Sequence, residues 1–146
     1  MMKSKWMLRA VLALVAGAMV SCQKVDQPSE AELLKTGLSG VWELVSVDTK
    51  ATVGSVTVSV YINFVEGDTF VLYQKIGEGR YTKFDGTYSV GEDKTLSGTY
   101  TGGKTWGPYQ ASLSGSSLTL STATGTEVDT YQKIDAIPAP VLENLY

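Results

Sequence analysis

Apolar and polar side chains alternate along one segment in the first half of the chain. The residues of one face are Val56, Val58, Val60, Ile62 and Phe64, and Thr, Ser, Tyr and Asn lie between them. A period of two is typical of a β-strand that buries one face and exposes the other. The pattern therefore predicts a strand over residues 56–65, in a sheet with one apolar side.

Similar runs of β-branched and aromatic residues continue to residue 134, separated by short turns of Gly, Asp, Ser and Thr. Turns this short join antiparallel neighbours, because a parallel crossover needs about a dozen residues or more. An antiparallel meander with one apolar face buries that face and removes both edges when it closes. The sequence therefore predicts an all-β fold, an eight-stranded antiparallel up-and-down barrel. Its strands are expected at residues 40–48, 56–65, 68–76, 80–90, 94–101, 105–113, 116–122 and 126–135.

The same alternation predicts which side chains face the barrel interior. Outside the 56–65 strand they are Trp42, Leu44, Phe70, Leu72, Phe84, Tyr88, Val90, Leu96, Tyr100, Tyr109, Leu113, Leu118, Leu120, Val128 and Ile134. Three strand carboxylates, Glu43, Glu127 and Asp129, are expected on the solvated face. An inward carboxylate is the more informative alternative, since it would bind a cationic group or have a perturbed pKa.

A short helix is expected before the barrel, over residues 30–36. Ser29 is in the capping position, acidic residues occupy the first turn, and Lys35 lies in the last. Each of these placements stabilises a helix end, and Gly37 follows as a stop signal.

The segment after the last strand contains Pro138 and Pro140, which predict an extended path. Its apolar residues are expected to lie back on the barrel, and docking of a partner is the alternative. They are Ile137, Val141, Leu142, Leu145 and Tyr146.

The N-terminal residues have the pattern of a bacterial lipoprotein signal. Basic residues precede an apolar run, and the stretch AMVSC, which resembles a lipobox, ends at Cys22. This predicts a lipoprotein signal peptide at residues 1–21, a lipidated tether at 22–29 and a barrel domain at 30–146. Acyl chains on Cys22 would anchor the protein to a membrane. Gln23 after the cysteine favours the outer over the inner membrane, and the periplasmic and surface faces both stay open.

Charge and composition argue against several functional classes. Removal of residues 1–21 leaves 9 of the 12 basic residues and all 15 acidic ones, a net charge near −6, which would repel nucleic acid. The sequence has no histidine, which excludes Ser-His-Asp chemistry and nearly all zinc sites. The carboxylate pairs Glu66/Asp68 and Glu92/Asp93 lie beside glycine in predicted turns. The chain is therefore expected to be non-catalytic, with no metal or cofactor.

Four segments follow the expected helix in the order LSGVWEL, INFVEGDTFVLY, GTYSV and SLTLSTATGTEVDTYQKI. Together they resemble the lipocalin-like, calycin-type lipoproteins of the Bacteroidota. The resemblance implies that the strand with Gly40 and Trp42 closes the narrow end of the barrel, with Trp42 beneath its floor. It also implies a late basic residue over that tryptophan, for which Lys133 is the candidate.

An eight-stranded barrel is either filled by side chains or holds one small ligand. Residues 95–126 are rich in Gly, Ser and Thr, while the earlier strands carry most bulky side chains, so we expect a modest cavity lined by the first four strands. The expected function is binding of a small apolar or amphipathic molecule. The alternative is a structural or interaction lipoprotein with a filled barrel, acting as an accessory subunit through its outer surface, with protein partners unknown. The expected lining is Phe64, Phe70, Leu72, Phe84, Tyr88, Tyr100 and Tyr109.

Overall fold

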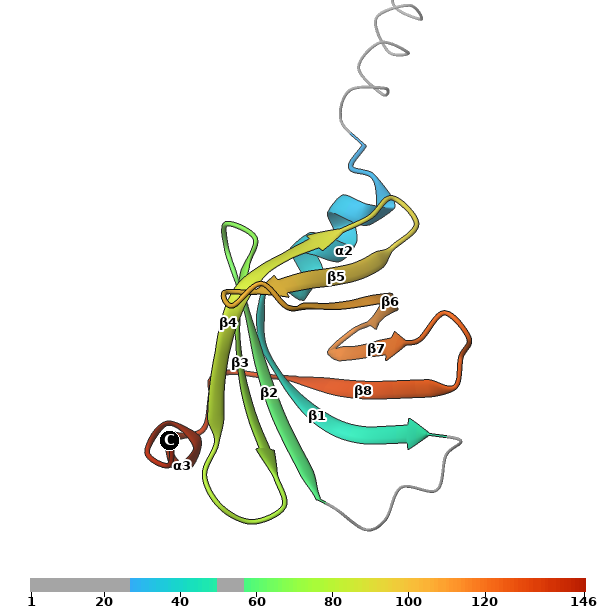
Figure 1. The fold of residues 1–146 in the computed structure, drawn as a ribbon. Helices are drawn as coiled ribbons and strands as arrows, with labels where there is room; N and C mark the ends of the chain where they lie inside the picture. The colour runs from blue at the N-terminus through green and yellow to red at the C-terminus, as the bar shows by residue number, and fades with distance from the viewer. Residues whose placement is uncertain (1–26, 50–56) are drawn as a thin grey trace, which may run out of the picture.

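The computed structural model describes residues 27–49 and 57–146 of the chain. Helix α2 (Glu30–Leu38) leads into a closed antiparallel barrel whose strands are neighbours in chain order, and helix α3 (Ala139–Leu142) follows (Figure 1). The expected eight-stranded up-and-down barrel is thus confirmed, with every strand end within about two residues of its predicted position. The strands are β1 (Gly40–Thr49), β2 (Val58–Val65), β3 (Thr69–Ile76), β4 (Thr82–Val90), β5 (Thr95–Tyr100), β6 (Thr105–Ser114), β7 (Ser117–Ser121) and β8 (Glu127–Ile134).

The barrel closes between its first and last strands. β1 pairs with β2 on one side and with β8 on the other, so Trp42 stands opposite both Ile62 and Lys133. The register of β1 against β8 shifts between Leu44 and Ser46, which places a β-bulge at Val45. A bulge adds one residue to one strand, so the side-chain alternation of β1 changes phase there relative to β8.

The predicted inward face was wrong for β8. Val128 and Ile134 do not belong to the barrel core, whereas Tyr131 is buried in it and Asp129 lies on the same face. Opposite residues of paired strands share a face, and Tyr131 stands opposite the fully buried Leu118 of β7. The inward face of β8 is its more polar one, so the alternation within this strand alone indicated the opposite orientation.

The other predicted inward residues that the structure describes lie on the inner side, except that Val58, at the start of β2, is 39% exposed and does not belong to the core. Most belong to the core cluster or pack against it. Phe84 faces inward opposite Leu72 and packs on Tyr100, with ring centroids 5.6 Å apart. Val56, the first residue of the alternating segment, lies outside the described residues.

Helix α2 packs against β4 and β6 at one end of the barrel, and Leu34 and Leu38 are buried in the core. Its first turn forms a reciprocal capping box, in which Ser29 Oγ accepts the Glu32 N–H and Glu32 Oε2 accepts the Ser29 N–H. The helix runs two residues past its predicted end. Gly37 therefore lies inside the helix and does not end it. A glycine suits this position because a Cβ there would lie 2.5 Å from Leu113 Cδ1.

The start of β1 connects this helix to the barrel. Gly40 has φ +121°, a conformation that favours glycine, and a Cβ on it would lie 3.0 Å from Lys133 Cε. Trp42 is fully buried, and its Nε1 donates a hydrogen bond of 2.8 Å to the Leu38 carbonyl. Lys133 Nζ lies 5.4 Å from the centroid of the Trp42 ring. The indole, the helix end and the lysine are thus packed together at this end of the barrel.

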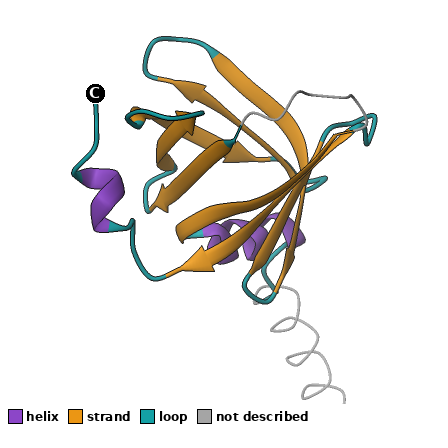
Figure 2. Ribbon diagram, turned by 90° about the horizontal axis from the view of Figure 1, so that it is seen from below, coloured by secondary structure: helices purple, strands orange, loops and turns teal. Residues whose placement is uncertain are grey.

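A second apolar cluster lies on the outside of the barrel, where α3 stands against the wall (Figure 2). Val141 is buried there against Tyr73 and Tyr81, and Ile137 and Leu145 pack around them. The expectation that the C-terminal segment lies on the barrel is confirmed for these three apolar side chains.

Two details of that segment differ from the prediction. Leu142 and Tyr146 are 49% and 83% exposed and do not belong to the cluster. The path is not extended throughout, because Pro138 caps α3 and Pro140 lies in its first turn, where an N–H has no intrahelical acceptor to lose. Neither helix of the described residues is long and apolar enough to cross a membrane.

Candidate binding cavity

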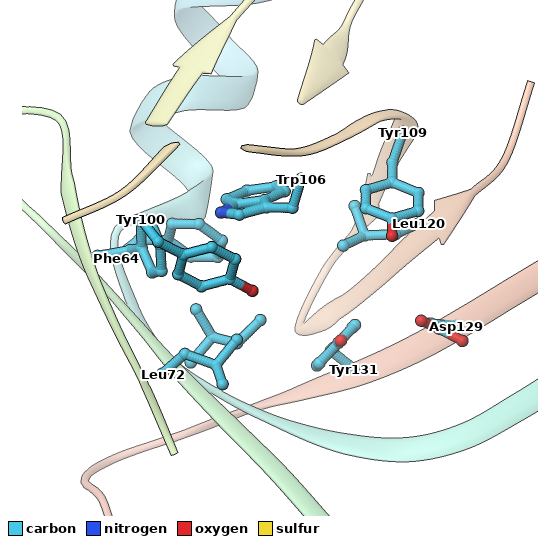
Figure 3. A pocket seen from close by; sticks show the side chains of 10 residues that line it. Phe64, Leu72, Tyr100, Trp106, Tyr109, Leu120, Asp129 and Tyr131 are labelled. Carbon is cyan, nitrogen blue, oxygen red and sulfur yellow. The ribbon is translucent and has the colours of Figure 1, made fainter. Parts of the chain in front are cut away.

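The barrel contains a partly open cavity of about 100 Å³, lined by side chains of β2, β3 and β5 to β8 (Figure 3). Its apolar wall comes from three strands. β2 contributes Ile62 and Phe64, β3 contributes Phe70 and Leu72, and β7 contributes Leu120. The other wall carries polar atoms on aromatic rings and one carboxylate.

Aromatic side chains of β5 and β6 form much of this second wall. The Trp106 ring meets Phe70 edge to face at 5.4 Å and an interplanar angle of 87°, and it stacks with Tyr109 at 6.3 Å. Phe70 also meets Tyr100 at 5.7 Å and 70°. Edge-to-face and stacked pairs of this kind are favourable, so the rings hold one another in place.

The glycine-rich half of the barrel makes room for these rings. A Cβ on Gly98 of β5 would lie 2.4 Å from two carbons of the Trp106 indole. The indole therefore rests directly on the backbone of the neighbouring strand. Because Gly98 has no side chain, the Trp106 ring from β6 fills the space that a side chain of β5 would otherwise occupy.

Asp129 and Tyr131 project into the cavity from β8, across from Trp106 and Tyr109 (Figure 3). Asp129 Oδ1 is buried and has no hydrogen-bond partner among the described residues. Burial, and then the negative charge of Glu127, raise the pKa of the Asp129 carboxyl from its ordinary 3.8 to about 6. Burial, with the Asp129 charge next, also raises the pKa of Tyr131. The expectation that Glu127 and Asp129 lie on the outward face was wrong, because both share the inward face of β8 with Tyr131.

The structure places five of the seven predicted lining residues at the cavity: Phe64, Phe70, Leu72, Tyr100 and Tyr109. The other two lie away from it, Tyr88 in the core cluster and Phe84 outside that cluster. Tyr88 packs edge to face on Phe64 at 5.0 Å, and Phe84 lies behind Tyr100.

The lining is not confined to the first four strands, as the sequence had suggested. β1 and β4 contribute no lining side chain, while β5, β6, β7 and β8 contribute six. Sequence reasoning missed Ile62, Trp106, Leu120, Asp129 and Tyr131 as lining residues, although Ile62 and Leu120 were expected inside the barrel. The large rings of β5, β6 and β8 reach into the space that small residues leave open.

The other acidic side chains of interest lie away from the cavity. Glu43 Oε1 accepts a hydrogen bond of 3.2 Å from Tyr61 on the outer wall. Asp68 pairs with Lys35, and Asp93 Oδ1 accepts a hydrogen bond of 2.7 Å from Thr95 within a turn. The turn interpretation of both carboxylate pairs is confirmed. In the parts of the chain that the structure describes, no three His, Cys, Asp or Glu side chains gather as a metal site would require.

A closed antiparallel barrel with a helix at one end and a mainly apolar interior cavity has the architecture of small-ligand barrels. Residues 38–120, more than half of the chain, match the family model described as a lipocalin-like domain. The chain therefore belongs to the lipocalin-like family, whose members are generally binding proteins rather than enzymes. No curated protein matches it.

Proposed function

We propose that the protein binds a small apolar or amphipathic molecule in the barrel cavity. The observation that carries this proposal is the cavity itself, with one apolar wall and a few polar groups on the other, the usual composition of a ligand site. The lining residues come from strands at the start of the barrel, β2 and β3, and from strands at its end, β7 and β8. The site can therefore form only when the barrel is closed.

The volume restricts the ligand. Ligand pockets commonly measure roughly 300–1,000 Å³, and benzene occupies an engineered cavity of roughly 150 Å³. At about 100 Å³, this cavity is too small for a whole long acyl chain but large enough for a few heavy atoms. The ligand is therefore a small molecule, or the head group of a larger one that reaches out of the barrel.

The small volume also favours the alternative function, a nearly filled barrel that acts through its outer surface. The two proposals differ in one measurable respect, which is whether the interior takes up a small molecule saturably.

Indole N–H resonances in NMR spectra of the purified protein provide the test. Trp106 lines the cavity. Trp42 does not line it, and its indole N–H donates a hydrogen bond to the Leu38 carbonyl at the helix-covered end, so its signal is an internal reference. We expect some members of a set of small apolar and amphipathic compounds to shift the Trp106 signal saturably and leave that of Trp42 in place. A set that includes 1-chlorobutane and short amines, alcohols and acids, and that shifts neither signal at millimolar concentration, would contradict ligand binding.

Leu72→Phe supplies the matched variant, because the larger ring would occupy part of the cavity. Thr69→Phe places the same ring on an exposed position of the same strand. Binding should be lost in the first variant and retained in the second. Thermal unfolding of both variants checks that the barrel is intact.

The proposal has a second part, an anchor at Cys22 in the cell envelope, outer membrane rather than inner. Its support is the sequence alone, since Cys22 lies outside the described residues. Metabolic labelling with a clickable palmitate analogue should mark the wild-type protein and not Cys22→Ser. Separation of the two membranes by density would then locate the labelled protein, and absence of label would refute the anchor.

A further inference from the structure

We infer that the ligand is a small organic ammonium ion, held by the Asp129 carboxylate against the aromatic wall of the cavity. This inference rests on the proposed function and names the chemical class of the ligand. Three observations support it: the unpaired charge of Asp129, the aromatic rings opposite that residue, and the volume of the cavity.

The charge of the site is unbalanced. Asp129 Oδ1 is buried without a hydrogen-bond partner, and the charge that acts on the carboxyl is that of Glu127, also an acid. No Lys or Arg of the described residues forms an ion pair with Asp129. The side chain is half-buried, and burial of Oδ1 without a partner disfavours the charged form of the carboxyl unless a counter-charge is supplied. A cation that enters the cavity would supply it.

The rings opposite Asp129 suit the same kind of ligand. Trp106 and Tyr109 stack on each other on one side of the cavity, and Tyr131 lies beside Asp129 on the other (Figure 3). The face of an aromatic ring attracts a cation, most strongly for Trp, and the attraction grows when water is excluded. An alkylammonium can therefore place its charge at Asp129 and its methylene groups against the rings and the apolar wall.

Other classes of ligand fit less well. An anion would meet Asp129 and Glu127, which share one face of β8. A purely apolar molecule would exclude water from the carboxylate and leave it without a partner, which is more costly than leaving it hydrated. A neutral alcohol could donate a hydrogen bond to Asp129 and accept one from Trp106 Nε1, which is also buried without a partner among the described residues, but it would not neutralise the charge. About 100 Å³ accommodates a short alkyl chain with its amine.

Three molecules of equal length separate these classes: n-butylammonium, 1-butanol and butyrate. We expect butylammonium to shift the Trp106 indole signal with an affinity at least tenfold higher than that of butanol, and butyrate to have no effect. Equal affinities for butylammonium and butanol would overturn the inference while the proposed function stands. Failure of butylammonium alongside binding of 1-chlorobutane, an apolar molecule of similar length, would do the same, and failure of both would refute the two proposals together.

Asp129→Asn keeps the shape of the side chain and removes its charge. We expect it to weaken butylammonium binding at least tenfold and to leave that of butanol within twofold. Asp85→Asn removes the same charge from an exposed position on β4 and should change neither. Unchanged butylammonium affinity in Asp129→Asn would contradict the inference, since the barrel would then recognise the alkyl chain alone.

Lys50 directly follows the last residue of β1 in the sequence and lies outside the described residues. Lys50→Gln therefore completes the set of variants. An unchanged butylammonium affinity supports an external cation as the partner of Asp129. A tenfold gain would mean that the lysine of the chain itself occupies the site, which would overturn the inference.

Discussion

Asp129 carries its charge in surroundings that disfavour it. Its carboxyl has a pKa of about 6 in the folded protein against an ordinary 3.8, so the folded state binds the proton more tightly than the unfolded chain does. For an acid with a raised pKa, stability is highest below the ordinary value and falls as the pH rises toward the folded value. The window in which stability is lost therefore runs from about pH 4 to about pH 6.

This predicts that Asp129→Asn stabilises the protein at neutral pH. The pKa difference corresponds to roughly 3 kcal/mol, and because the side chain is only half-buried, solvent screening reduces the expected gain to about 1–2 kcal/mol. Urea unfolding at pH 7 and at pH 4 measures it. The gain should disappear at pH 4, where the wild-type carboxyl is itself neutral, and an equal gain at both pH values would show that charge is not its origin.

The same titration predicts the pH dependence of ammonium binding. Affinity for butylammonium should fall as the pH drops through about 6, because the protonated carboxyl no longer offers a counter-charge. The titratable groups around it are Glu127 on β8, Tyr131 beside it and Tyr109 on β6. Burial raises the pKa of both tyrosines, so they stay neutral through this range.

Titration of the Trp106 indole signal with butylammonium from about pH 5 to 8 measures this dependence. Asp129→Asn is the control and should give a flat, weak profile. A wild-type affinity that stays constant over this range would show that binding does not depend on the Asp129 charge.

Among the elements, the bounds of all eight strands could be predicted, and so could the inward face of strands β1 to β7, because each of these seven carries its own evidence. Apolar residues alternate within them, and glycine-containing turns separate them. β8 lacks that evidence: its inward face holds Glu127, Asp129 and only one large apolar side chain, Tyr131. Its orientation follows from register with β7 and from the bulge in β1, which are long-range features that one strand does not encode.

The candidate site could likewise be predicted only in part from the sequence. Its apolar wall could be predicted from alternation along β2 and β3. The position of Trp106 over Gly98 depends on two strands together, and so does the inward Asp129. The residues that give the cavity its chemical character therefore emerge only once the strands are paired.

Helix α3 and the segment around it act as a brace on the outer wall. Val141 is 2% exposed, and it covers Tyr73 and Tyr81 together with Ile137 and Leu145. Burial of one such aliphatic side chain contributes about 1.5–3 kcal/mol. Deletion of residues 137–146 should therefore lower the free energy of unfolding by about 3 kcal/mol, as measured in urea.

A partner-docking role would give a different result. The deletion would then leave stability unchanged and reduce association with another protein. Val141→Ala is the milder companion variant and should lose about half as much stability. Leu142→Ala, at an exposed position of the same helix, should have little effect on stability.

On the scale of the whole molecule, the barrel is a closed unit whose core, cavity and outer brace all lie within residues 30–146. The proposed anchor at Cys22 is separated from Glu30 by a polar stretch. Anchor and barrel should therefore act independently, with the lipid deciding location and the barrel deciding affinity.

A chain that begins at residue 23 after an initiator Met tests this independence. It should fractionate with soluble protein, unfold within about 0.5 kcal/mol of the lipidated form in the same detergent, and bind butylammonium with the same affinity, because the core residues that the structure describes begin at Leu34. Fractionation, urea unfolding and the Trp106 signal measure the three properties separately. A loss of affinity without a loss of stability would instead assign the N-terminal segment, or the membrane that holds it, a part in forming the site.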